Sequence, residues 1–306
     1  MLKRTRLAVL AVVVLFATTA VAQVSLTTLG SPSTQNFDSL ASSGTPAWTD
    51  NSTLPGWYSQ FTAVTTNPTT YATGTGTSTT GALYSFGVAG TNPVTDRALG
   101  SLASGTPGNI LFAVRFANNT GTTITSFNIS YNGEEWRNGG NATPQKLDFQ
   151  YQIVSAGTIT DANTPTTGWT DFDSLDFTSP IATVTAAALD GNAAANRTAL
   201  SATLTVSVPA GQEIWLRWLD TNDAGNDHGL AIDDLSVTPQ GVPPNNPPTI
   251  TAPANPITTV AQNAAPFTVG LSGSDDGGIY NWSATTGTGI QSVNVTGGQG
   301  TAEQVE

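Results

Sequence analysis

The sequence predicts an all-β protein whose main part is a jelly-roll-like antiparallel β-sandwich. Apolar and polar residues alternate along several segments, which is the pattern of strands that bury one face and expose the other. Turn-forming residues separate these segments, with 31 glycines and 18 prolines among 306 residues, as is typical of extracellular β proteins. Helical periodicity is almost absent, and a single helical turn is expected at residues 186–195.

Residues 1–22 have the composition of a secretory signal peptide. Basic residues open the segment, the apolar run 7–17 follows, and the small residues at 20–22 form a cleavage site. The apolar run is too short to cross a bilayer. We therefore expect a secreted protein, extracellular or at the cell surface, with no membrane span once the leader is removed.

The charge balance and the missing cysteines exclude several classes of site. The chain has 9 basic and 21 acidic residues, and the leader holds three of the basic ones, so six basic residues remain against twenty-one acidic. Such a balance opposes binding to phosphate backbones, and we expect no nucleic acid partner for this region. Because no cysteine is present, disulfides, thiolate nucleophiles and cysteine-bound zinc are excluded.

Residues 23–238 are expected to form the sandwich. Up to about residue 108, short apolar groups alternate with loops rich in Gly, Pro, Ser and Thr, which indicates short strands. Clearer strands follow at residues 110–116, 124–131, 146–153 and 200–208. The last three each have one apolar and one polar face, so we expect two sheets packed through their apolar faces.

The most informative stretch is residues 213–238, which predicts a strand, an acidic loop and a closing strand. Before the loop, apolar side chains occupy alternate positions. After it, Leu230 and Ile232 share one parity, whereas Leu235 and Val237 share the other. The inward face therefore switches at residues 233–234, which predicts a β-bulge there.

Carboxylate and amide side chains crowd this stretch and predict a calcium site. Calcium takes six to eight oxygen ligands in flexible geometry. The loop is not an EF-hand, because no Glu stands at its twelfth position and strands flank it. A solvated polar hairpin loop is the alternative. The candidate ligands are Asp220, Asn222, Asp223, Asp227, Asp233 and Asp234.

A second candidate site binds a ligand through Glu135, Trp136, Arg137 and His228. An exposed indole that stacks on a sugar ring, beside a carboxylate and a guanidinium, would bind carbohydrate. In the alternative, Trp136 caps the sandwich core, because buried aromatic residues stabilise sandwiches, and Arg137 pairs with Glu134, Glu135 or an acid of the loop. For His228, the only histidine, loop packing or a hydrogen bond to a neighbouring Asp is the alternative.

Beyond the sandwich, residues 239–249 are expected to form a proline-rich linker. Five of its first ten residues are proline, which favours an extended, semi-rigid spacer. Residues 250–306 resume short strands and predict part of an immunoglobulin-like (Ig-like) β domain. Such a domain needs about 100 residues, so we expect this repeat to be truncated and the chain to be a fragment of a longer protein.

Two motifs resemble the N-terminal jelly-roll module of large bacterial secreted multidomain proteins: NISYNGEEWRNGG at 128–140 and EIWLRWLDTNDAGNDHGLAIDDLSV at 213–237. In that family the module precedes Ig-like repeats and, in some members, an extracellular endonuclease/exonuclease/phosphatase domain. The resemblance covers residues 24–238 and implies an accessory, non-catalytic module without an assigned ligand. Its likeness to carbohydrate-binding jelly rolls is an analogy of fold.

The sequence therefore predicts a secreted, non-catalytic binding module, stabilised by calcium, whose partner is an extracellular polysaccharide or a cell-surface component. No catalytic motif occurs, and we expect no enzymatic activity within these residues. Two alternatives stay open. The chain is the non-catalytic N-terminal part of a secreted nuclease or phosphatase whose catalytic domain lies beyond residue 306, or it is a structural spacer of a surface or adhesion protein.

Overall fold

The computed structural model describes residues 23–64, 67–88 and 96–242, together with four short strands further on. The chain divides into two compact units, Met1–Val242 and Pro243–Glu306. The leader expected at residues 1–22 lies outside the described residues. Among the residues that are described, no helix has the length and apolar character needed to cross a membrane.

The first unit is a β-sandwich, as predicted, and one of its layers is a seven-stranded sheet that we call sheet A. Its strand order is β1-β7-β14-β9-β10, with β3 added to β7 and β11 added to β9. All its pairs are antiparallel except β1 with β7. The strands are β1 (Val24–Leu26), β3 (Trp57–Phe61), β7 (Ile110–Asn118), β9 (Lys146–Ser155), β10 (Thr170–Asp171), β11 (Phe177–Thr178) and β14 (Gln212–Asp220).

The other layer, sheet B, has eight strands. Its order is β12-β8-β15-β6-β5-β4, with β13 added to β8 and β2 added to β15. Only β4 and β5 pair in parallel within it. The strands are β2 (Ser33–Gln35), β4 (Ala72–Gly74), β5 (Ala82–Phe86), β6 (Ala98–Leu102), β8 (Ile124–Asn138), β12 (Ala187–Ala188), β13 (Arg197–Val208) and β15 (Gly229–Gly241).

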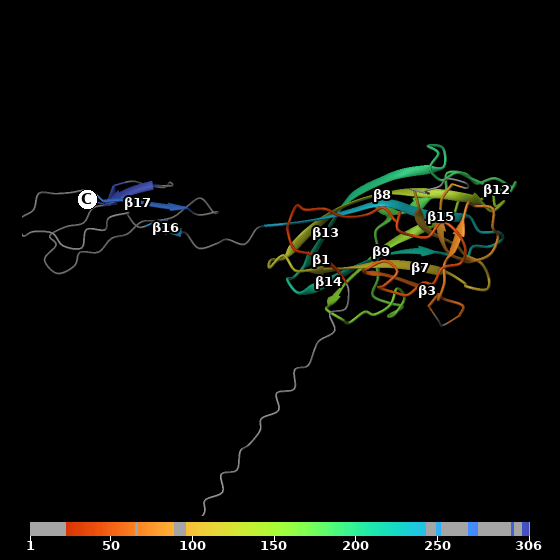
Figure 1. Cartoon of the computed structure of the whole chain (residues 1–306), viewed down its shortest axis with the longest axis horizontal. Coiled ribbons are helices and arrows are strands. Elements are labelled where there is room, and N and C mark those ends of the chain that lie inside the picture. The colour runs from red at the N-terminus through yellow and green to blue at the C-terminus, as the bar shows by residue number, and fades with distance from the viewer. Residues whose placement is uncertain are drawn as a thin grey trace, which may run out of the picture. The chain divides into compact units, whose positions relative to one another are not determined.

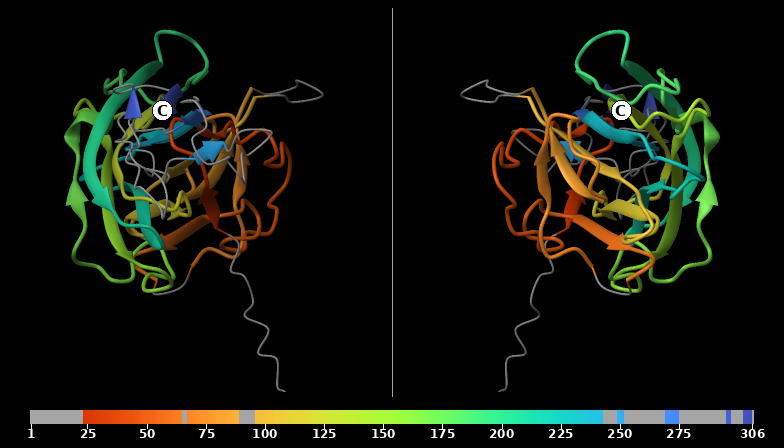
Figure 2. Two further views of the ribbon diagram at one scale, coloured as in Figure 1. Left: turned by 90° about the vertical axis from the view of Figure 1, so that its left-hand side faces the viewer. Right: turned by 90° about the vertical axis from the view of Figure 1, so that its right-hand side faces the viewer.

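Figure 1 shows the two layers, with β8, β13 and β15 in one and β3, β7, β9 and β14 in the other. Figure 2 shows that the orange strands from the first part of the chain lie at one edge of the sandwich and the green strands β9 and β13 at the other edge. A 3-10 turn, η1 (Asp173–Leu175), lies between β10 and β11. The prediction of an all-β sandwich is confirmed.

Trp218 occupies the middle of the core between the two sheets. Alternation along β14 turns Ile214, Leu216 and Trp218 inward, and each is at most 1% exposed. The Trp218 ring stacks on Trp57 and Phe112 at centroid distances of 5.9 and 5.7 Å. Tyr131 and Phe149 meet it edge-on at 5.6 and 5.3 Å. The alternating pattern of this stretch thus builds the centre of the sandwich.

The predicted β-bulge is present in β15. The register with β8 shifts between Asp233 and Ser236, and Asp234 has a positive φ of 52°. Leu230 and Ile232 before the bulge and Leu235 and Val237 after it are all buried. The extra residue lets one strand keep its apolar side chains inward across the change of parity.

One expectation about secondary structure is wrong, and one expected strand is longer than predicted. Residues 186–195 form no helical turn; they hold the two-residue strand β12 and then turns that lie against β8. The strand expected at 124–131 continues to Asn138 as β8. It can do so because β15 pairs with one edge of this extension, and β13 and β12 pair with the other.

The sandwich also runs slightly past the expected boundary at Thr238. Strand β15 continues to Gly241, where it still pairs with Ile124. Residues 243–248 of the expected linker lie outside the described residues. In the second unit, β16 (Thr249–Thr251), β17 (Val269–Ser274), β19 (Ala302–Val305) and β18 (Val295–Thr296) form an antiparallel sheet in that order. A truncated Ig-like repeat stays a prediction for this unit.

Candidate functional site

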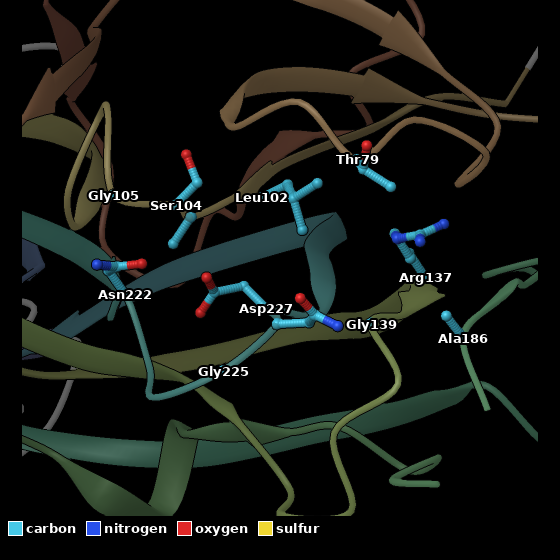
Figure 3. Close-up of a pocket in the computed structure, with 12 residues that line it drawn as sticks. Thr79, Leu102, Ser104, Gly105, Arg137, Gly139, Ala186, Asn222, Gly225 and Asp227 are labelled. Atoms are coloured by element: carbon cyan, nitrogen blue, oxygen red, sulfur yellow. The ribbon is translucent and has the colours of Figure 1, made fainter. Parts of the chain in front are cut away.

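A polar cavity of about 220 Å³ lies where the ends of β6 and β8 meet the loop between β14 and β15. We call it the end pocket. The acidic loop predicted from the sequence supplies Asn222, Asn226 and Asp227 to its wall, β8 supplies Arg137, and the turn after β6 supplies Ser104. Two of the predicted sites, the acidic loop and the segment around Arg137, therefore meet at one cavity (Figure 3).

Arg137 and Asp227 face the end pocket without pairing to each other. The Arg137 guanidinium donates one hydrogen bond, from Nη1 to the carbonyl oxygen of Gly76 at 3.1 Å. No ion pair of Arg137 occurs within the described residues, so the predicted alternative of a salt bridge to a nearby acid is not formed. Figure 3 shows the Asp227 side chain between Asn222 and Arg137.

The Asp227 side chain is 8% exposed. Its Oδ1 accepts a hydrogen bond from the backbone N–H of Asp223 at 2.8 Å. Burial raises the pKa of Asp227 to about 6, although the bond from Asp223 lowers it in part. The end pocket therefore contains a strong donor group and an acceptor carboxylate that titrates within two units of neutral pH.

A buried network holds the loop of the end pocket in place. The backbone N–H of His228 donates to Gln145 Oε1 at 2.6 Å, and Gln145 Nε2 donates to the carbonyl of Asn226 at 3.1 Å. His228 Nδ1 lies 2.8 Å from Glu135 Oε1. The second Glu135 oxygen accepts from the backbone N–H of Ile181 at 2.7 Å.

His228 and Glu135 are both 0% exposed. Neither of these two predicted ligand-binding residues lines the end pocket, and both belong to the buried network that holds its loop. The alternative expected for His228 was loop packing or a hydrogen bond to a neighbouring Asp. Its complete burial agrees with packing, and its side-chain partner is Glu135 rather than an Asp.

Of the two positions expected for Trp136, the structure shows the buried one, and the exposed indole needed for sugar stacking is not present. Its side chain is 1% exposed and stacks on Phe86 at 5.9 Å with an interplanar angle of 4°. Its indole N–H donates to Glu134 Oε2 at 2.9 Å. Gly191 packs so closely on the indole that a Cβ there would lie 2.3 Å from Nε1. The turns after β12 therefore cover Trp136, and it is not accessible to a sugar ring.

The six predicted calcium ligands fall into two groups. Asp220, Asp223 and Asp227 form the first group. Burial is the main cause that raises the pKa of Asp220 to about 8, and the nearby charges of Asp227 and Asp223 add to it. Asn222 belongs to this group by its place in the pocket wall.

Asp233 and Asp234 lie beside Glu134 on sheet B instead. Among the described residues, no three or more Asp, Glu or His side chains are arranged to hold a metal ion. The structure does not bring the six residues into one site, and bound calcium stays a prediction.

Some residues of the end pocket carried no sequence signal. Thr79 and Ser104 come from loops that are remote in sequence from the acidic stretch, and no motif spacing links them to it. Ser101 is similar: its hydroxyl donates to Asp220 Oδ2 at 2.7 Å across 119 residues of chain. Such contacts depend on the strand order, which a single sequence does not specify.

Comparison with known proteins adds little to this geometry. No family model matches the chain, and no curated protein matches it either. Thirty solved chains match. The K2 cleaved adhesin domain of Lys-gingipain is 16% identical, with 68% of this chain and 98% of that chain covered and a TM-score of 0.33.

Two further matches are of the same kind. The K1 cleaved adhesin domain of Lys-gingipain from Porphyromonas gingivalis is 15% identical, with 69% and 100% covered and a TM-score of 0.30. A structure described as "CBM4 structure and function" is 14% identical, with 47% and 70% covered and a TM-score of 0.24. These chains are weakly similar in structure, and scores this low carry no information about the ligand of the present chain.

Proposed function

We propose that this chain is a secreted, non-catalytic β-sandwich module that binds an extracellular polysaccharide or another glycan of a cell surface in the end pocket. One observation carries the proposal: Arg137 and Asp227 line the same cavity without pairing. A sugar hydroxyl both donates and accepts hydrogen bonds, so a wall with guanidinium, amide and carboxylate groups suits it.

The size of the end pocket limits what it can hold. Drug-sized ligands occupy cavities of roughly 300–1,000 Å³, and the end pocket measures about 220 Å³. A single sugar unit, at a chain end or in a side branch, fits this space better than an extended chain. Leu102 and Ala103 add apolar surface beside the polar groups, which suits the C–H face of a sugar.

The first test removes the guanidinium. Arg137→Ala is expected to weaken retention by polysaccharide at least tenfold in affinity electrophoresis, because the loss of a charged hydrogen-bond donor costs about 1.5–3 kcal/mol. Arg197→Ala is the matched control, since Arg197 is exposed on β13 and its loss changes the net charge equally. Equal retention of the two variants would rule out the end pocket. Absence of retention in the unmodified chain would favour the spacer alternative.

We further propose that calcium stabilises the loop of the end pocket. Asp220 and Asp227 support this proposal because burial raises the pKa of each, to about 8 and about 6, and a bound cation would stabilise their charged forms. Asp223 and Asp227 would supply carboxylate oxygens, and Asn222 an amide oxygen. Water would complete the six to eight ligands that calcium takes.

Calcium is expected to raise the melting temperature by roughly 5–10 °C at one hundred times its dissociation constant. This range follows from about 2.7 kcal/mol of linkage and about 2–4 °C per kcal/mol for a domain of this size. The measurement compares thermal melts in EDTA and in millimolar calcium. Asp223→Asn with Asp227→Asn should lose the rise, and Asp233→Asn should keep it. An unchanged melting temperature in the unmodified chain would contradict calcium binding.

Two alternatives from the sequence remain: the N-terminal part of a secreted nuclease or phosphatase, and a spacer of a surface or adhesion protein. The full-length gene distinguishes them. A downstream domain with the His, Asp and Asn residues of a nuclease or phosphatase would make this module the N-terminal part of such an enzyme. Further Ig-like repeats ending in a wall-sorting signal would favour the adhesion spacer.

A further inference from the structure

A long connection covers the outer face of sheet A. Between Ser155, where β9 ends, and Thr170, where β10 begins, fourteen residues form no strand or helix. We call this segment the 156–169 cover. Connections of about this length without regular structure are uncommon in compact domains and are usually functional loops, such as lids and binding loops, or linker segments.

The face beneath the cover combines aromatic, amide and guanidinium side chains. Trp215 on β14 stands opposite Arg115 on β7 and Gln152 on β9. Tyr58 of β3 packs on Trp215 at a centroid distance of 4.6 Å, and Arg115 Cζ lies 5.7 Å from each of these rings. These side chains point away from the core, because strand alternation turns Ile214 and Leu216 inward.

Three buried atoms of this face have no hydrogen-bond partner in the protein. They are the donor Trp215 Nε1 and the acceptors Gln60 Oε1 and Gln152 Oε1. Buried polar atoms in folded proteins nearly always have a partner, and each exception calls for an explanation. Because Trp215 itself is 0% exposed, the cover closes over polar groups that it does not satisfy.

Apolar packing and hydrogen bonds hold the cover on the sheet. Ile159 and Ala162 are its buried apolar residues, at 0% exposure, and they pack with Tyr58 and Trp215. Two hydrogen bonds join it to β14: Arg217 Nη1 donates to the carbonyl of Ala162 at 3.1 Å, and Gly157 N–H donates to Glu213 Oε2 at 3.3 Å.

At the end of the cover, the ring of the partly buried Trp169 lies 3.8 Å from Arg217 Cζ. This contact holds the end of the cover against β14, while Trp215 Nε1, Gln60 Oε1 and Gln152 Oε1 have no hydrogen-bond partner.

We propose that the outer face of sheet A is a second binding face, for a short glycan chain, and that the 156–169 cover is a lid that moves aside to admit it. Sugar rings pack their C–H faces on Tyr58 and Trp215, as aromatic side chains with polar tips allow. Their hydroxyls supply both the acceptor that Trp215 Nε1 lacks and the donor that Gln152 Oε1 lacks. None of these residues lines the end pocket.

The test loosens the lid while leaving the face intact. Ile159→Ser removes an apolar anchor of the cover, and hydrogen exchange of the full chain should then speed up within residues 156–169. Calorimetric titration uses cellohexaose, xylohexaose and mannohexaose as probes. Because closure of the lid competes with binding, Ile159→Ser is expected to bind at least one of them fivefold or more tightly than the unmodified chain.

Second-site variants decide where this gain arises. Gln152→Leu added to Ile159→Ser should abolish the gain, since it removes an acceptor of the face. Arg137→Ala added instead should leave the gain intact, which separates this proposal from the end pocket.

Three outcomes overturn the proposal. One is faster exchange in the cover with no gain in affinity, which assigns the unpartnered atoms to ordered water. Another is a gain that survives Gln152→Leu. The third outcome concerns a different variant, which is used if Ile159→Ser does not speed up exchange. In that variant a short Gly-Ser linker replaces residues 157–166 and uncovers the face. If it binds none of the three oligosaccharides, the proposal is overturned.

Discussion

Trp218→Ala is expected to lower the free energy of unfolding by roughly 3–5 kcal/mol, the range for removal of a buried large aromatic side chain. Trp218 is 0% exposed and contacts rings from both sheets, Trp57 and Phe112 by stacking and Tyr131 edge-on. Its removal leaves a cavity between the sheets that rigid strands cannot close.

Urea unfolding followed by circular dichroism measures this loss. Trp169→Ala serves as the matched control, because it removes the same side chain from a partly exposed position, and we expect it to cost about 1 kcal/mol. Equal losses for the two variants would mean that Trp218 does not organise the core.

Asp233→Asn is expected to stabilise the sandwich at alkaline pH by about 2–4 kcal/mol, in line with the penalty for an uncompensated buried charge. Asp233 is 3% exposed. Burial, and after it the charge of the neighbouring Glu134 carboxylate, raises its pKa to about 9. Glu134, 1% exposed on the adjacent strand, has a pKa raised to about 7, again chiefly by burial.

The direction of the pH dependence follows from proton binding. An unfolded aspartate has a pKa of about 3.9, and folded Asp233 has one of about 9. Between these values the folded state keeps a proton that the unfolded state has released, so the free energy of unfolding falls as pH rises. The protonated Asp233 therefore makes its full contribution to the free energy of unfolding below about pH 4, and this contribution is lost by about pH 9.

Urea unfolding at pH 4, 6 and 8 in EDTA tests this expectation. The asparagine variant should equal the unmodified chain near pH 4 and exceed it increasingly above that. Its amide oxygen can still accept from the backbone N–H of Asp234, which Asp233 Oδ1 does at 2.7 Å. Asp173→Asn, at an exposed position, should change nothing. A variant less stable than the unmodified chain at pH 8 would show that Asp233 is charged and paired.

Local patterns in the sequence were enough to predict the sandwich and its bulge. Alternation reports which side chains face inward, and the change of parity after Ile232 requires an extra residue wherever both halves of a strand stay buried. Asp234, which has a positive φ, is that extra residue. These features depend on near neighbours in the chain, so one sequence contains the information.

The helical turn expected at 186–195 does not form, because tertiary contacts outweigh the preference of alanine for helix. Leu189 N–H donates to the carbonyl of Trp136 at 2.8 Å, and Gly191 packs on the indole. The same contacts bury Trp136, which the sequence left open between a covered and an exposed position. A single chain gives no indication of which loop covers which aromatic residue.

The acidic residues show the same limit for the site. Asp220 and Asp233 are close in sequence, yet β14 belongs to sheet A and β15 to sheet B. Glu134, whose charge raises the pKa of Asp233 in the folded state, comes from a strand about a hundred residues earlier. Proximity in the sequence therefore grouped residues that lie apart in the fold, and it gave no sign that Asp233 and Glu134 form a buried pair of carboxylates.

Strand β15 has a mechanical consequence. It is the last strand of the first unit, and it pairs with β8 on one side and with β6 and β2 on the other. Its hydrogen bonds run across the strand axis, so tension applied through Gly241 loads many of them together in shear. By contrast, β1 pairs with β7 through three residues only. Under a stretching force, the sandwich should yield at its first strand long before its last.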